Sequence, residues 1–119
     1  MHELSLSSAI VNTAVKHAQG RQVSVVSVRA GRLRQVVPDT LRFYFDIVAR
    51  DSVCAGARLE LEVVPARLHC SGCERSWEIE VPAFVCPRCG PDGVTVQSGE
   101  EFEVESIEVD EVIAEEALR

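Results

Sequence analysis

The stretch LHCSGCERSWEIEVPAFVCPRCGPDGV, residues 68–94, holds four of the five cysteines of this 119-residue chain. They form two C-x2-C pairs, Cys70 with Cys73 and Cys86 with Cys89, which are separated by twelve residues. Each pair makes a tight turn that aims two thiolates at one point, and two such turns build a closed tetrahedral site that suits zinc. We therefore predict a structural Zn(II) site in a zinc-ribbon-like subdomain over residues 67–94.

Two other interpretations of these cysteines stay open. A set of four thiolates also holds single iron atoms in electron carriers, and ligand type alone does not exclude iron. A thioredoxin-like dithiol would need a βαβ context, which the sequence around the pairs lacks. The fifth cysteine, Cys54, is expected to be a small buried apolar residue.

Regular elements are predicted on both sides of the cysteine segment. Apolar residues at helical spacing predict one helix over 4–18 and a second that begins near Pro38. Strands are predicted in Val-rich or alternating stretches: 23–30, 58–63, 77–81, 94–96 and 102–109. We expect an α/β (α+β) fold, in which two helices pack on one face of a three-stranded sheet. The main domain would comprise residues 1–66 plus 95–119, with the cysteine subdomain inserted between them.

Charge and hydropathy exclude several classes of function. The net charge is −7, and residues 90–119 hold ten acidic side chains against Arg119 alone. Such a chain is a poor nucleic-acid binder, because phosphate neutralisation supplies most of that affinity. No apolar run reaches the roughly 20 residues needed to cross a bilayer, and no signal peptide is visible. Five cysteines without an export signal are typical of a reducing compartment, so we expect a cytoplasmic protein.

The first residues, Met1-His2-Glu3, place an imidazole beside an α-amine and the intervening backbone amide. These nitrogens can converge on one metal ion, and the carboxylate of Glu3 lies next to them. An all-nitrogen set of this kind suits Ni(II) or Cu(II). A histidine at position two is also common as an ordinary exposed residue, so the motif alone does not decide the function.

Taken together, three features of the chain resemble the HypA/HybF family of hydrogenase nickel-incorporation proteins. They are the start Met1-His2-Glu3, the stretch from Gly31-Arg32-Leu33 to Val37-Pro38-Asp39-Thr40-Leu41-Arg42-Phe43, and the two cysteine pairs. The similarity extends from the amino terminus to about Ile107. It implies a nickel metallochaperone that delivers Ni(II) to [NiFe]-hydrogenase, with a role toward urease left open.

The resemblance also implies the residues and partners involved. His2 would be the main nickel ligand, with Met1, Glu3 and Asp39 as helpers, although Asp39 in a first helical turn also suits the helix dipole. The implied partners are a HypB-type GTPase and a hydrogenase large subunit, and we expect a monomer or weak homodimer. The chain shows no phosphate loop, nucleophile elbow or open metal site, so we do not expect an enzyme. The alternative is a zinc-ribbon adaptor that transfers no nickel.

Overall fold

The computed structural model describes residues 2–110 of the chain, with side chains from Glu3 onward. These residues form two compact units. The first comprises the residues up to Val28, Val36–Glu62 and those from Glu103 on, and the second comprises Arg29–Gln35 and Val63–Phe102. Both cysteine pairs belong to the second unit.

Two helices form one layer of the first unit. Helix α1 spans His2–Ala18 and helix α2 spans Pro38–Ala49, with Pro38 at the start where the sequence predicts it. Leu41 and Phe45 of α2 are fully buried, as their spacing predicts. The Ser7 hydroxyl donates a hydrogen bond of 3.1 Å to the Leu41 carbonyl and so joins the two helices. None of the described helices is long and apolar enough to cross a membrane.

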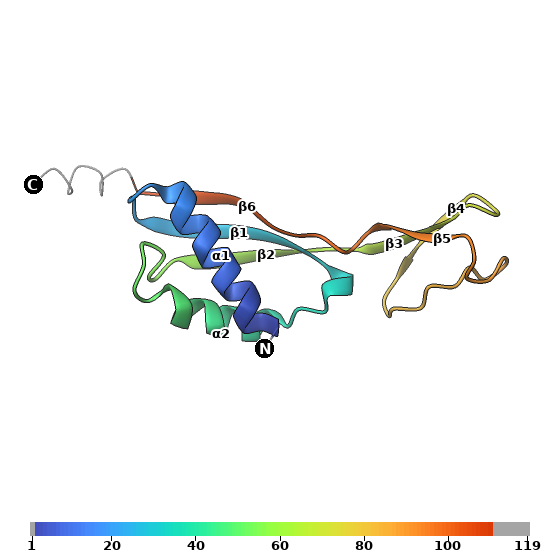
Figure 1. Ribbon diagram of the computed structural model, residues 1–119, viewed down its shortest axis with the longest axis horizontal. Helices are drawn as coiled ribbons and strands as arrows, with labels where there is room; N and C mark the ends of the chain where they lie inside the picture. Colours follow the sequence, from blue (N-terminus) through green and yellow to red (C-terminus); the bar gives the residue numbers. More distant parts are fainter. Residues whose placement is uncertain (1, 111–119) are drawn as a thin grey trace, which may run out of the picture. The chain divides into compact units, whose positions relative to one another are not determined.

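A three-stranded sheet forms the other layer. Its strands are β1 (Val23–Gly31), β2 (Arg58–Val64) and β6 (Phe102–Val109), in the order β2-β1-β6. Helix α1 crosses the front of this sheet in Figure 1, and α2 lies near its β2 side. The Val-rich sequence of β1 suits the central position, because a central strand covered by helices is almost fully buried. The prediction of two helices with a three-stranded sheet is confirmed.

The second unit contains a sheet that the sequence analysis did not predict. Its strands are β3 (Ala66–Cys70), β4 (Arg75–Ile79) and β5 (Val94–Ser98), all antiparallel and in the order β4-β3-β5. Buried Ala66, Leu68 and Cys70 alternate with partly exposed residues in β3, and this period of two is the signal that was overlooked. The strand expected at 77–81 lies two residues earlier, because it pairs with β3 in the register Leu68↔Trp77.

The second unit is closed by a segment that is distant in sequence. A short 3-10 helix, η1 (Arg32–Arg34), follows β1. The Gly31 N–H donates a hydrogen bond of 2.6 Å to the Glu101 carbonyl, and the Leu33 N–H donates one of 2.8 Å to the Gly99 carbonyl. A Cβ atom on Gly31 would overlap the backbone of Gly99, so only glycine allows this approach.

Candidate metal centres

The secondary structure of the second unit brings the two cysteine pairs together. Cys70 is the last residue of β3, and Cys73 lies in the turn that leads to β4. Glu74 closes this turn with a left-handed φ of 59° and an N–H bond of 2.7 Å to the Cys70 carbonyl. Cys86 and Cys89 lie in a second turn, closed by two 3.0 Å hydrogen bonds between the backbones of Cys86 and Gly90.

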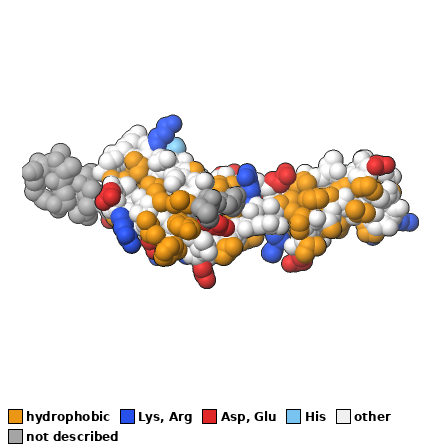
Figure 2. Space-filling view, turned by 60° about the horizontal axis from the view of Figure 1, so that its bottom comes forward, with side chains coloured by type: hydrophobic (Ala, Val, Ile, Leu, Met, Phe, Trp, Pro, Cys, Tyr) orange, Lys and Arg blue, Asp and Glu red, His pale blue; other side chains and the backbone are white. Residues whose placement is uncertain are grey.

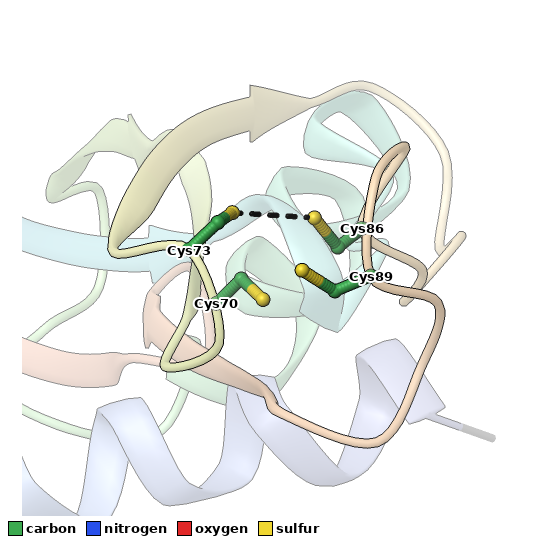
Figure 3. A group of neighbouring side chains, drawn as sticks. All are labelled: Cys70, Cys73, Cys86 and Cys89. Atoms are coloured by element: carbon green, nitrogen blue, oxygen red, sulfur yellow. Dashed lines mark hydrogen bonds between the residues drawn. The ribbon is translucent and has the colours of Figure 1, made fainter.

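The four sulfur atoms lie close enough to share one ion. All are within 4.8 Å of one another, and the sulfurs of Cys73 and Cys86 are 3.7 Å apart. Figure 3 shows the two pairs facing each other with their sulfurs directed at a common point. A tetrahedral zinc ion with Zn–S bonds of about 2.3 Å separates its sulfurs by about 3.8 Å. All five cysteines are free thiols, and the donor set of this cluster fits zinc.

Backbone groups next to the sulfurs shape the cluster further. The Arg88 N–H points at the Cys86 sulfur at 3.4 Å, and this contact stabilises a thiolate. A Cβ atom on Gly72 would lie 3.2 Å from the Cys89 sulfur, a tight contact that would require this sulfur to move by a few tenths of an ångström. Glycine at this position of the Cys-x-Gly-Cys pattern therefore leaves the Cys89 sulfur undisturbed.

The pKa values of the cysteines show how the cluster depends on a cation. The hydrogen bond from the Arg88 N–H lowers the pKa of Cys86 to about 7. Hydrogen bonds with the Cys70 and Cys73 sulfurs raise the pKa of Cys89 to about 12, and desolvation raises the pKa of Cys73. Four adjacent thiolates repel one another unless a positive ion lies among them. A divalent cation among the sulfurs would compensate the repulsion between the thiolates and displace the protons of the remaining thiols.

Zinc affinity is expected to fall with decreasing pH, and to fall more steeply below about pH 7. Above that pH Cys86 is already a thiolate, because its pKa is about 7. Below it, zinc must displace one further proton, so more protons are released per ion bound. Calorimetry of zinc binding in two buffers of different ionisation enthalpy, at about pH 6 and about pH 8, measures this number. If the number of protons released per zinc ion were equal at the two pH values, the lowered pKa assigned to Cys86 would be wrong.

His69, the neighbour of Cys70, is engaged elsewhere. Its Nδ1 is hydrogen-bonded with the Ser76 hydroxyl at 2.9 Å, and its Nε2–H donates to the Glu74 carboxylate at 3.2 Å. Both ring nitrogens therefore have partners away from the sulfurs. Cys54, the fifth cysteine, is fully buried in the first unit, as expected of a small apolar residue, and desolvation raises its pKa.

Of the predicted nickel residues, the structure describes the His2 backbone and Glu3 at the start of α1 and Asp39 at the start of α2. Helix α1 starts at His2, two residues before the predicted start, while Met1 and the His2 side chain lie outside the described part. The Glu3 carboxylate accepts a 3.2 Å hydrogen bond from the Val37 N–H. Asp39 follows in the first turn of α2, fully exposed, with its carboxylate 3.9 Å from the Arg42 guanidinium. The start of α1 therefore meets the start of α2, where Asp39 is located.

Sequence reasoning missed the partner of Glu3. Val37 lies 34 residues further along the chain and offers only its backbone, so no side-chain pattern marks the contact. The cue in the sequence is indirect: residues 37–40, Val-Pro-Asp-Thr, start a helix without a good capping side chain at its first position.

Comparisons with known proteins agree on one family. Residues 1–109 match the family model described as hydrogenase/urease nickel incorporation, metallochaperone, HypA. The hydrogenase maturation factor HypA of Geobacter metallireducens is 40% identical over 110 residues, covering 92% of this chain and 100% of that protein. HypA of Caldanaerobacter subterraneus is 38% identical over 114 residues, covering 92% and 100%.

A solved structure shares the fold. The solution structure of the Ni metallochaperone HypA from Helicobacter pylori superposes with a TM-score of 0.65 at 24% identity, covering 92% of this chain and 97% of that one. At this level of identity the likeness concerns the arrangement of helices and strands.

Proposed function

Since the chain belongs to the HypA family of nickel metallochaperones for hydrogenase maturation, we propose that its first residues carry the nickel. The nickel ligands would be His2 with the Met1 amine, helped by Asp39. Cys70, Cys73, Cys86 and Cys89 would hold a structural zinc ion. The main support for assigning the two metals to separate sites is the closed group of four sulfurs. A metal ion held by all four has no open coordination position from which it could be transferred to another protein.

The backbone at the start of α1 supports a nickel site there. The first four N–H groups of a helix have no carbonyl partner within it. The His2 amide is one of them, because α1 begins at this residue. A metal ion can therefore bind the amide nitrogen without breaking a helical hydrogen bond. A few nitrogen ligands at the end of a chain also suit a carrier, which must release the ion downstream.

The two metal sites differ in the chemistry of their ligands. Thiolates are soft ligands that suit zinc, whereas the amine, amide and imidazole nitrogens suit Ni(II). We propose a nickel-binding domain of residues 1–66 plus 95–119 and a zinc subdomain of residues 67–94. Zinc, as the resident ion, would supply a fixed cross-link between the two turns and no catalysis, so the protein acts as a carrier and not as an enzyme.

Delivery of nickel requires contact with other proteins, and we propose a HypB-type GTPase and a hydrogenase large subunit as partners. Exposed apolar side chains support contacts of this kind. Phe43 and Ile47 lie one helical turn apart on α2 and are 61% and 39% exposed. Hydrophobic side chains are visible at the surface in Figure 2. The free thiols fit the reducing cytoplasm, where we place this work.

The test of this proposal is the content of nickel and zinc per chain. Untagged protein beginning at Met1 is expected to bind one nickel ion in addition to zinc. The same protein with an uncleaved amino-terminal extension should keep zinc and bind nickel weakly, because the extension removes the α-amine from the ligand set. Nickel that binds equally well to both samples, or only through the cysteines, would favour the zinc-ribbon adaptor instead.

A further inference from the structure

We infer that Glu3 is a positioning residue that caps helix α2 from helix α1, and that its carboxylate is not a nickel ligand. The inference rests on the proposed nickel site at the amino terminus. It is carried by the hydrogen bond from the Val37 N–H to the Glu3 carboxylate, 3.2 Å long, which joins the first turns of the two helices.

Helix α2 lacks the usual cap within its own sequence. Its N-cap residue is Val37, whose carbonyl accepts the first helical hydrogen bond from Leu41, but whose own side chain makes no capping hydrogen bond. In a capping box, a Glu or Gln three residues into the helix reaches back to the N-cap N–H. Thr40 occupies that position here and is too short for this bond. Glu3 supplies the missing half of the box from the other helix.

Electrostatics favours the same arrangement. The amino end of each helix carries a partial positive charge, and a carboxylate stabilises it there. Glu3 lies in the first turn of α1 and contacts the first residue before α2, so one carboxylate serves two helix ends. A cation bound beside two such ends is disfavoured unless negative groups lie nearby. Glu3 therefore supports nickel mainly through position while its oxygen stays on Val37, and its charge is expected to contribute no more than about threefold in affinity.

The cap also determines which residues meet at the proposed nickel site. His2 precedes Glu3 directly, and Asp39 lies two residues after Val37. Fixing Glu3 to Val37 therefore brings the backbone of His2 to the turn that bears Asp39. A metal ion at the Glu3 oxygen that accepts the Val37 N–H would compete with this donor and so weaken the contact between the two turns.

Two substitutions of Glu3 distinguish a cap from a ligand. Glu3→Gln keeps an oxygen that accepts the Val37 N–H, whereas Glu3→Ala removes it. We expect Glu3→Gln to bind nickel within about threefold of wild type, and Glu3→Ala to lose about tenfold to a hundredfold, as is usual for groups that orient metal ligands. Nickel titration calorimetry gives the affinities, and Glu60→Ala serves as a control at an exposed carboxylate that pairs with Arg58.

A second readout does not depend on nickel. Hydrogen exchange of the Val37 amide, measured by NMR, should be slow in wild type and in Glu3→Gln but fast in Glu3→Ala. Val37→Pro removes the donor itself, and the φ of −92° at this position is near the range that proline accepts. This variant should lose as much nickel affinity as Glu3→Ala, and the double variant should lose no more than either alone. Val37→Ala, which keeps the N–H, is its control.

Each outcome separates the two proposals. A wild-type protein that binds no nickel would overturn the proposed function, while the exchange of the Val37 amide would still test the cap. If nickel binds to wild type but Glu3→Gln is as weak as Glu3→Ala, the carboxylate is a ligand and the inference is wrong. An unchanged affinity in Val37→Pro would overturn it as well. Thermal melting of each variant shows whether the helices remain folded.

Discussion

His2→Ala is expected to lose nickel almost completely while zinc remains bound at the wild-type level. The substitution removes the imidazole, which we propose as the main ligand, and leaves only the amine and amide nitrogens at the start of α1. Loss of a direct ligand should exceed the tenfold to hundredfold effect of outer groups, so we expect at least about a hundredfold weaker binding. Zinc should be unaffected, because its four candidate ligands lie in the second unit.

His17→Ala is the matched control for this experiment. His17 lies near the other end of the same helix, is exposed, and its Nδ1–H donates a 2.9 Å hydrogen bond to the Thr13 carbonyl. Nickel and zinc per chain are measured by elemental analysis after gel filtration, and nickel affinity by calorimetry. Equal nickel loss in both variants, or full nickel retention in His2→Ala, would contradict the proposed site.

Cys73→Ser is expected to release zinc and to unfold the second unit. Structural zinc contributes on the order of 10–16 kcal/mol to the folding of small zinc domains at neutral pH. The second unit has few other sources of stability, because two of its buried side chains, Cys70 and Cys86, belong to the cluster itself. Its other buried hydrophobic side chains, Ala30, Val64, Ala66 and Leu68, form only a small core. Removing one thiolate therefore removes most of its stabilisation.

Cys54→Ala provides the control for the loss of a thiol. Cys54 is also fully buried, but it belongs to the first unit and is not a member of the four-cysteine cluster. This variant should keep its zinc and show only the modest destabilisation of a small cavity, about 1 kcal/mol. Zinc content, limited proteolysis over residues 63–102 and thermal unfolding distinguish the two variants. A second unit that stays protected from protease in zinc-free Cys73→Ser would contradict the expected role of the metal.

The features predicted correctly from sequence depend on neighbours along the chain. Apolar residues such as Leu41 and Phe45 recur at helical spacing, and proline is favoured in the first turn of a helix, where Pro38 lies. Helix α2 was therefore predictable. The cysteine pairs are local turns, and their spacing alone indicated that four sulfurs would meet. Periodicity and turn chemistry therefore identified the helices and the cluster before any tertiary contact was known.

The features that were missed depend on residues far apart in the sequence. Strand β3 is short, so its alternation of three buried residues is a weak signal, and its pairing with β4 on one side and β5 on the other becomes evident only in the sheet. The segment Arg29–Gln35 joins the second unit through bonds to carbonyls about 70 residues later, as Gly31 does to Glu101. The bond from Val37 to Glu3 uses a backbone donor, which any residue except proline provides.

The backbone bonds of Gly31 and Leu33 also set an order of events during synthesis. Their acceptors, Glu101 and Gly99, leave the ribosome long after the donors, whereas all four clustered cysteines emerge before residue 90. A nascent chain can thus bind its metal ion at the four cysteines before the acceptors of the Gly31 and Leu33 hydrogen bonds have been synthesised. The second unit is then completed when Gly31 and Leu33 bond to these late carbonyls, after the metal has already joined the two cysteine turns.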